Sequence, residues 1–110
     1  MSESAITNAK LPIPVLEQFL SVLQTTTTAS GTRTKVPATA LAYRRAILIQ
    51  NNHTSNTVYL GSVTVTADTG AAGGYQLGPS DSVVFTLDGS VDLYAIASAS
   101  STPVTTLEFA

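Results

Sequence analysis

The residues that could do chemistry in this sequence are most concentrated in a glycine-rich run, TGAAGGYQLGP, at positions 69–79. Such a run can hold a phosphate, because backbone N–H groups reach a ligand where no Cβ intervenes. A nucleotide-binding loop also needs Lys and Ser/Thr after its last glycine, or a fixed glycine spacing between a strand and a helix. Here Gly74 is followed by Tyr75 and Gln76. The run therefore favours a flexible connection that carries the chain between sheets.

A catalytic or metal-binding constellation is not predicted. His53 is the only histidine, and it lies in NNHTSN with no acidic neighbour to orient its ring, as is typical of an exposed loop residue. Aspartates flank the expected turns, where they commonly hydrogen-bond their own backbone. Their spacing does not match a calcium-binding loop. We expect no catalytic residue, no metal and no cofactor. The aspartates are Asp68, Asp81, Asp88 and Asp92.

Arg44 and Arg45 are the one adjacent basic pair in the sequence. Neighbouring strand residues point to opposite faces, so the two side chains form one patch only if they precede the strand. The pair fits an ordinary solvated strand entrance or, alternatively, a salt bridge to a partner subunit. Both arginines are therefore candidate partner contacts.

Tyrosines offer a second kind of binding chemistry, because aromatic rings can stack against sugars. Tyr43, Tyr59, Tyr75 and Tyr94 could form such a platform, with Tyr59, Tyr75 or Tyr94 as the binding residues, although the chain has no Trp. Their spacing fits sheet faces and core edges equally well. A carbohydrate-binding module for attachment to a host surface is thus an alternative function.

Composition excludes several classes of protein. The net charge is −2 with five basic residues in total, whereas a nucleic-acid binder needs clustered Lys and Arg. The chain has no cysteine for a disulfide framework or a Cys-based zinc site. No apolar run approaches the roughly 20 residues that span a bilayer, and residues 1–10 lack the pattern of a signal peptide. We expect neither nucleic-acid nor membrane partners, and no Sec-type export.

The chain is of single-domain length and its composition favours β-structure. Ser and Thr supply 29 of 110 residues, and β-branched side chains suit a pleated surface. The pattern predicts an all-β fold, a single antiparallel β-sandwich or small barrel of about seven or eight short strands. DGS at 88–90 carries hairpin-turn chemistry. Extended segments are expected at 24–28, 36–43, 44–52, 57–61, 62–68, 81–87, 91–98 and 103–109.

Residues 1–24 are predicted to form an N-terminal arm, with the sandwich domain at 25–110. Within VLEQFLSVLQ (15–24), apolar residues recur at helical spacing after Pro14, which favours a short docking helix. The alternative is a strand that begins near Ser21 and continues through TTTT. The candidate partner contacts in the arm are Val15, Leu16, Phe19, Leu20 and Leu23.

A sequence of short motifs connects this chain with a known group of proteins. In order, these are Arg45 with Ile47 to Asn51, Val58 to Gly61, Val65-Thr66, Leu77 to Pro79, Leu93 to Ala97 and Val104 to Glu108. The pattern resembles a family of small β-sandwich proteins and domains in tailed bacteriophage virions. It consists of strands and turns and contains no catalytic residues, and the first 35 residues lie outside it.

The resemblance implies a non-enzymatic virion component assembled in the host cytoplasm. A capsid decoration (cement) protein is the preferred role, and a neck or tail accessory protein is the alternative. The implied partners are major capsid or portal/tail subunits and further copies of the chain itself, as a homo-oligomer. The weakly charged, Thr-rich composition agrees with a protein that packs against neighbouring subunits.

Overall fold

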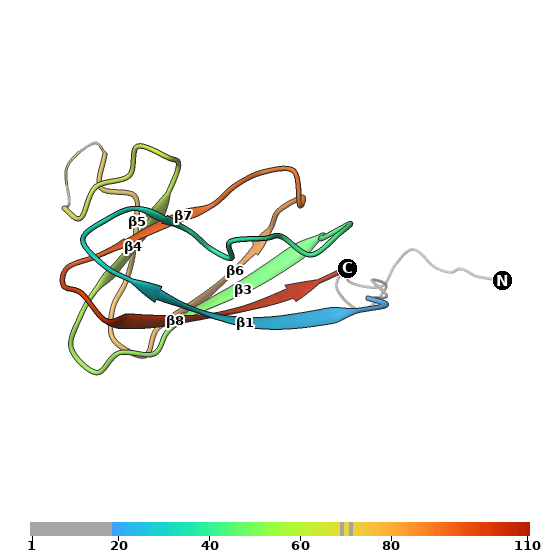
Figure 1. Cartoon of the computed structure of the whole chain (residues 1–110), viewed down its shortest axis with the longest axis horizontal. Coiled ribbons are helices and arrows are strands. Elements are labelled where there is room, and N and C mark those ends of the chain that lie inside the picture. Colours follow the sequence, from blue (N-terminus) through green and yellow to red (C-terminus); the bar gives the residue numbers. More distant parts are fainter. Residues whose placement is uncertain (1–18, 69, 71) are drawn as a thin grey trace, which may run out of the picture.

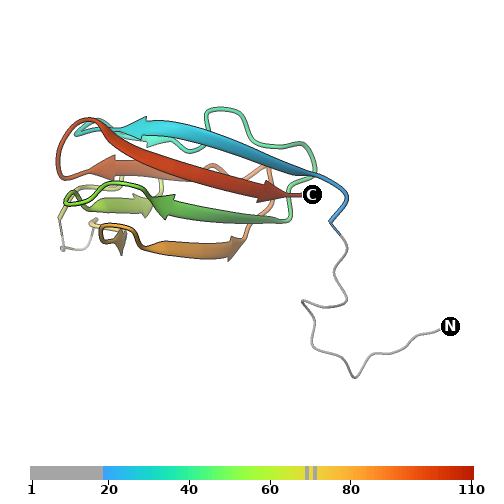
Figure 2. The ribbon, with the colours of Figure 1, turned by 90° about the horizontal axis from the view of Figure 1, so that it is seen from below.

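The computed structural model describes residues 19–68, 70 and 72–110, and these residues form an antiparallel β-sandwich (Figure 1). Two four-stranded sheets make its layers, in the orders β1-β8-β3-β6 and β2-β7-β4-β5. Figure 2 shows the two layers stacked face to face. The strands are β1 (Val22–Ala29), β2 (Thr34–Lys35), β3 (Ala46–Asn51), β4 (Val58–Gly61), β5 (Tyr75–Leu77), β6 (Ser82–Thr86), β7 (Tyr94–Ala97) and β8 (Thr102–Phe109).

The predicted all-β sandwich of seven or eight short strands is confirmed. The segment RRAILIQNN forms β3, which lies between β8 and β6 in the first sheet. Along β3, buried Ile47 and Ile49 alternate with half-buried Leu48, so one face points into the sandwich and the other outward. The neighbouring strands follow the same alternation, which fixes the register of the sheet.

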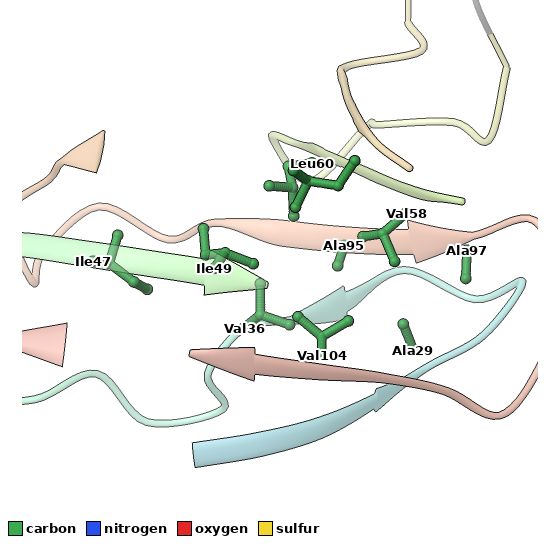
Figure 3. Close-up of a cluster of buried hydrophobic side chains, with 10 residues drawn as sticks. Ala29, Val36, Ile47, Ile49, Val58, Leu60, Ala95, Ala97 and Val104 are labelled. Atoms are coloured by element: carbon green, nitrogen blue, oxygen red, sulfur yellow. The ribbon is translucent and has the colours of Figure 1, made fainter. Parts of the chain in front are cut away.

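The hydrophobic core fills the space between the two sheets (Figure 3). Ile47, Ile49 and Val104 extend from the first sheet towards Val58 and Leu60 of the second, and all five are buried. Val36 and Leu77 complete the cluster together with three small side chains, which are Ala29, Ala95 and Ala97.

The favoured helix over 15–24 is wrong for its described part. Residues 22–24 begin strand β1, so the alternative strand starting near Ser21 is the one that forms. Register explains the outcome: Val22 to Ala29 pair continuously with Phe109 to Thr102 of β8. An apolar periodicity of ten residues carries little helical stability of its own, and eight strand pairings override it. The predicted boundary between arm and sandwich at 24/25 thus falls inside β1.

Three local expectations also differ from the structure. Residues 36–43, which are expected to be extended, form bends and a turn, whereas for 62–68, whose pattern fits a half-buried strand or an extended loop, the loop alternative is the one that forms. The glycine-rich run contains a short strand, β5, paired with β4. The DGS turn does not close a hairpin, because β6 and β7 belong to different sheets. Sequence chemistry marked a turn correctly there, but it carried no information on which sheet the next strand joins.

Candidate interaction surface

An apolar surface lies at the end of the sandwich where β1 begins. The N–H groups of Leu20 and Ser21 both donate to the carbonyl of Ala110, which holds the start of the described chain beside the end of β8. Leu20 has 90% of its surface in solvent. We call this region the apolar corner; it consists of Phe19, Leu20, Val22 and Phe109.

Phe19 is packed against the sandwich in a defined position. Its ring lies 5.2 Å from the ring of Phe109, centroid to centroid, with the planes tilted by 43°. The guanidinium carbon of Arg45 lies 4.9 Å from the centre of the Phe19 ring, a cation–π distance. Phe19 nevertheless keeps 41% of its surface exposed. The corner therefore makes contacts within its own chain and still offers apolar area to a partner.

The outer face of the first sheet continues this surface. The register places Gln24, Leu107, Leu48 and Val84 in one row across the four strands. Leu48 and Leu107 are half-buried, and Val84 is 60% exposed. Strands β1, β3 and β6 contain no charged residue, and Glu108 of β8 is buried. A neutral and partly apolar face thus runs from β1 to β6.

Arg44 does not belong to this surface. It is 2% exposed, and its Nη1 donates to Glu108 Oε2 at 2.8 Å. Its Nε donates to the carbonyl of Leu87, and its Nη2 donates to the carbonyls of Asp88 and Val91, all in the connection between β6 and β7. The guanidinium therefore bonds within its own chain, and neither predicted alternative, a solvated strand entrance or a salt bridge to a partner subunit, describes it.

Glu108 completes this buried ion pair. Its Oε2 also accepts the Leu41 N–H at 3.0 Å, and the side chain is fully buried. Within the described residues its Oε1 has no hydrogen-bond partner. A buried charge is costly unless it is paired, so Arg44 and Glu108 must stay together in the folded state. Their contacts therefore link β8 to the connection that leads into the second sheet.

The structure thus separates the predicted contact residues. Phe19 and Leu20 lie at the apolar corner, with exposed Arg45 against Phe19. Leu23 is also exposed, but its pairing with buried Glu108 puts it on the opposite face of the sheet from Val22. Arg44 is in the interior. Val15 and Leu16 lie outside the described residues.

Val22, Val84 and Phe109 also belong to this surface, but they are not among the contact residues predicted from the sequence. A strand period of two, applied to residues 22–28 and 103–109, would have placed Val22 and Phe109 on outer faces. Their adjacency depends on the pairing of β1 with β8, two strands at opposite ends of the chain. Asn51 was not predicted either. It is a buried residue whose Nδ2 donates to the carbonyls of Asn56 and Leu77.

The glycine-rich run packs tightly against its own chain. Gly74 has φ of +68°, and a Cβ there would lie 2.3 Å from the Leu60 carbonyl oxygen. A Cβ on Gly73 would lie 1.8 Å from the carbonyl oxygen of Asp68. These glycines permit close contact between backbone segments, so they serve packing. The expected connection between sheets is therefore wrong for residues 70 and 72–74, which join β4 to β5 within the second sheet. Only the short segment between β5 and β6 crosses to the first sheet.

A small hollow lies beside this run. Its volume is about 150 Å³, below the range of about 300–1,000 Å³ common for small-molecule sites. Its residues offer hydroxyls and backbone, with no ionisable side chain among them. They are Gly61, Ser62, Thr64, Val65, Ala72 and Gly74.

His53 and Asp88 have structural partners. His53 Nδ1 accepts the N–H groups of Ser55 and Asn56, which shapes the loop before β4. The pKa of the exposed Asp88 carboxyl is lowered, first by the hydrogen bond from the Ser90 hydroxyl and then by the Ser90 backbone N–H. Within residues 19–68, 70 and 72–110, no three His, Cys, Asp or Glu side chains gather to hold a metal ion.

The tyrosines do not form one platform. Tyr59 is buried in a second apolar cluster with Val65 and Ile96, against which Tyr94 packs. Tyr75 is half exposed and meets the ring of Phe85 edge-on at 6.0 Å. The buried ring of Tyr59 offers no face to a sugar. Tyr43 and Tyr75 are exposed, but no ring contact joins them in the described residues, so the carbohydrate-binding alternative gains no support.

Comparison with known proteins leaves the surface as the main guide to function. No family model, curated protein or solved structure matches the chain. In the part that the structure describes, no helix has the length and apolarity to cross a membrane.

Proposed function

We propose that this chain is a non-enzymatic structural protein of a tailed bacteriophage virion, with capsid decoration as its role. The observation that carries the proposal is the apolar corner, continuous with the neutral outer face of the first sheet. Exposed apolar patches of this kind mark protein–protein contacts. The motif resemblance supplies the virion context, and the corner supplies the means of contact with capsid subunits.

Strands β1, β3 and β6 carry no charge, and Arg45 places a single cation at the apolar corner, a pattern that favours a protein partner over a nucleic acid. A phosphate backbone is held by clustered Lys and Arg, whereas β1, β3 and β6 have none. The basic residues that the structure describes either bond within their own chain or lie apart from one another. Arg44 is in the core and Arg33 donates to the carbonyl of Val65.

Copy number in purified virions tests the role. We expect the chain at an abundance comparable with that of the major capsid protein, measured by quantitative mass spectrometry. A copy number that fits one small ring would instead indicate the neck or tail. Complete absence from the particle would reject the proposal in both forms.

A matched pair of variants tests the surface. Leu20→Asp places a charge on the apolar corner, and we expect it to reduce incorporation into particles at least tenfold. Val63→Asp is the control, because Val63 is also exposed, at 57%, but lies in the loop after β4. Equal incorporation of the two variants would show that the corner is not the docking surface.

Binding of the chain to a glycan array would favour the carbohydrate-binding alternative.

A further inference from the structure

The open edge of β1 is the least protected strand edge in the described structure. Four strands form sheet edges, and β1 is the longest of them, with eight residues against five in β6, three in β5 and two in β2. Soluble proteins protect such edges with charged residues, proline, bulges or a covering segment. The sequence VLQTTTTA contains no charge and no proline, and its pairing with β8 is continuous, without a bulge.

The hydrogen bonds at the end of the strand show which backbone groups face the open side. Ser21 and Ala110 exchange both of their N–H···O bonds. Because hydrogen-bonded pairs alternate along an antiparallel ladder, Leu23, Thr25 and Thr27 also direct their backbone groups towards β8. The intervening residues therefore direct their N–H and C=O groups away from the sheet; these are Val22, Gln24, Thr26 and Thr28.

From this edge we infer that two copies of the chain pair through β1, antiparallel about a two-fold axis, to join their first sheets into one. The inference deepens the proposed function and rests on it for the biological setting, since it adds a second copy as a partner at the backbone edge of β1, beside the apolar corner. When Thr25 lies on the axis, every residue whose N–H and C=O groups point outward forms hydrogen bonds with a residue of the partner. Gln24 then pairs with Thr26 of the partner, and Val22 pairs with Thr28 of the partner.

A second copy fits this edge better than an unrelated strand. The row of alternating donors and acceptors is self-complementary under a two-fold axis, which is the geometry of most homodimers. The strand is uncharged, so the axis brings no like charges together. The pairing also places Val22 and the outer face of one copy beside those of the other, which extends the neutral surface without interruption.

Cysteine cross-linking tests the register directly, because the chain has no cysteine of its own. With Thr25 on the axis, the two Thr25 residues form a non-hydrogen-bonded pair with Cα atoms about 4.5 Å apart, within the range for a disulfide. We expect Thr25→Cys to form a covalent dimer under mild oxidation. Val84→Cys on β6 is the control and should stay monomeric on denaturing gels, although Val84 is 60% exposed.

A proline variant tests the edge without disturbing the sandwich. Thr26 directs its N–H outward, so Thr26→Pro removes no bond to β8 and is tolerated at a sheet edge. We expect Thr26→Pro to be monomeric by light scattering and Thr26→Val, which keeps the N–H, to remain dimeric. Circular dichroism checks that both variants are folded.

The outcomes separate this inference from the proposed function. A wild-type chain that is monomeric at all concentrations, a dimeric Thr26→Pro variant, or failure of Thr25→Cys to cross-link would each overturn the β1 pairing. None of these results would change the copy number or the effect of Leu20→Asp on incorporation. If Thr26→Pro does not fold, the contrast between Thr25→Cys and Val84→Cys decides the matter alone.

Discussion

At the scale of single residues, Arg44 is the residue whose role depends most on the fold. In sequence it is half of an exposed-looking basic pair, yet its guanidinium donates to Glu108 and to three carbonyls in the interior. Arg45, the next residue, is exposed and lies against Phe19. The two adjacent arginines thus have separate roles. Arg44 links β8 to the connection between β6 and β7, and Arg45 lies at the apolar corner.

Removing one member of the buried pair should be strongly destabilising. We expect Arg44→Ala or Glu108→Ala to lower the free energy of unfolding by about 3–5 kcal/mol, because either change leaves an uncompensated buried charge. Urea denaturation measures the loss. The Arg44→Met/Glu108→Leu double variant should lose less than either single variant, since it leaves no buried charge. A single-variant loss of under about 1 kcal/mol would contradict this account.

At the scale of elements, the glycine-rich run shows how backbone packing replaces side-chain chemistry. The Thr66 N–H donates to the carbonyl of Ala72, and the Gly73 N–H donates to the carbonyl of Gly70, so the segment closes on itself before β5. Val65 is buried against Tyr59 and Ile96 by this closure. The loop therefore covers an apolar part of the second sheet.

Substitution of Gly74 should damage this element more than substitution of a nearby glycine. Gly74→Ala combines a left-handed backbone with a clash at the Leu60 carbonyl, and the backbone conformation alone should cost about 1–3 kcal/mol. Gly31→Ala is the control, because a Cβ there meets no atom within 4 Å and its φ is ordinary. Thermal melts should show a lower Tm for Gly74→Ala only. Equal Tm values would mean that the close approach is not important for stability.

At the scale of the whole molecule, the two sheets depend on one shared core. Ile47 and Ile49 of the first sheet pack with Val58 and Leu60 of the second, so neither sheet can bury its apolar face alone (Figure 3). The Arg44–Glu108 pair adds a polar tie between β8 and the connection into the second sheet. The sandwich should therefore unfold as a single cooperative unit.

A core substitution in one sheet should weaken both. We expect Ile49→Ala to cost about 2–5 kcal/mol and to lower the protection of amides in β4 and β7 together with those in β3 and β8. Native-state hydrogen exchange measures this residue by residue. Loss of protection in the first sheet alone would show that the sheets open independently.

Sequence patterns determined much of this protein. Alternating apolar residues, β-branched composition and turn chemistry identified the β-sandwich and located most of its strands, because a strand's period of two is a local property. They also predicted Phe19, Leu20 and Leu23 as candidate contact residues, and all three side chains are exposed. Only the tertiary structure decided that residues 22–24 are strand and that Arg44 is buried. Both outcomes depend on β8, the last strand, which pairs with β1 and carries Glu108. The apolar corner and the open edge of β1 arise from the same pairing between the two ends of the described chain. Local sequence patterns cannot predict this pairing, because the two strands are far apart in the sequence.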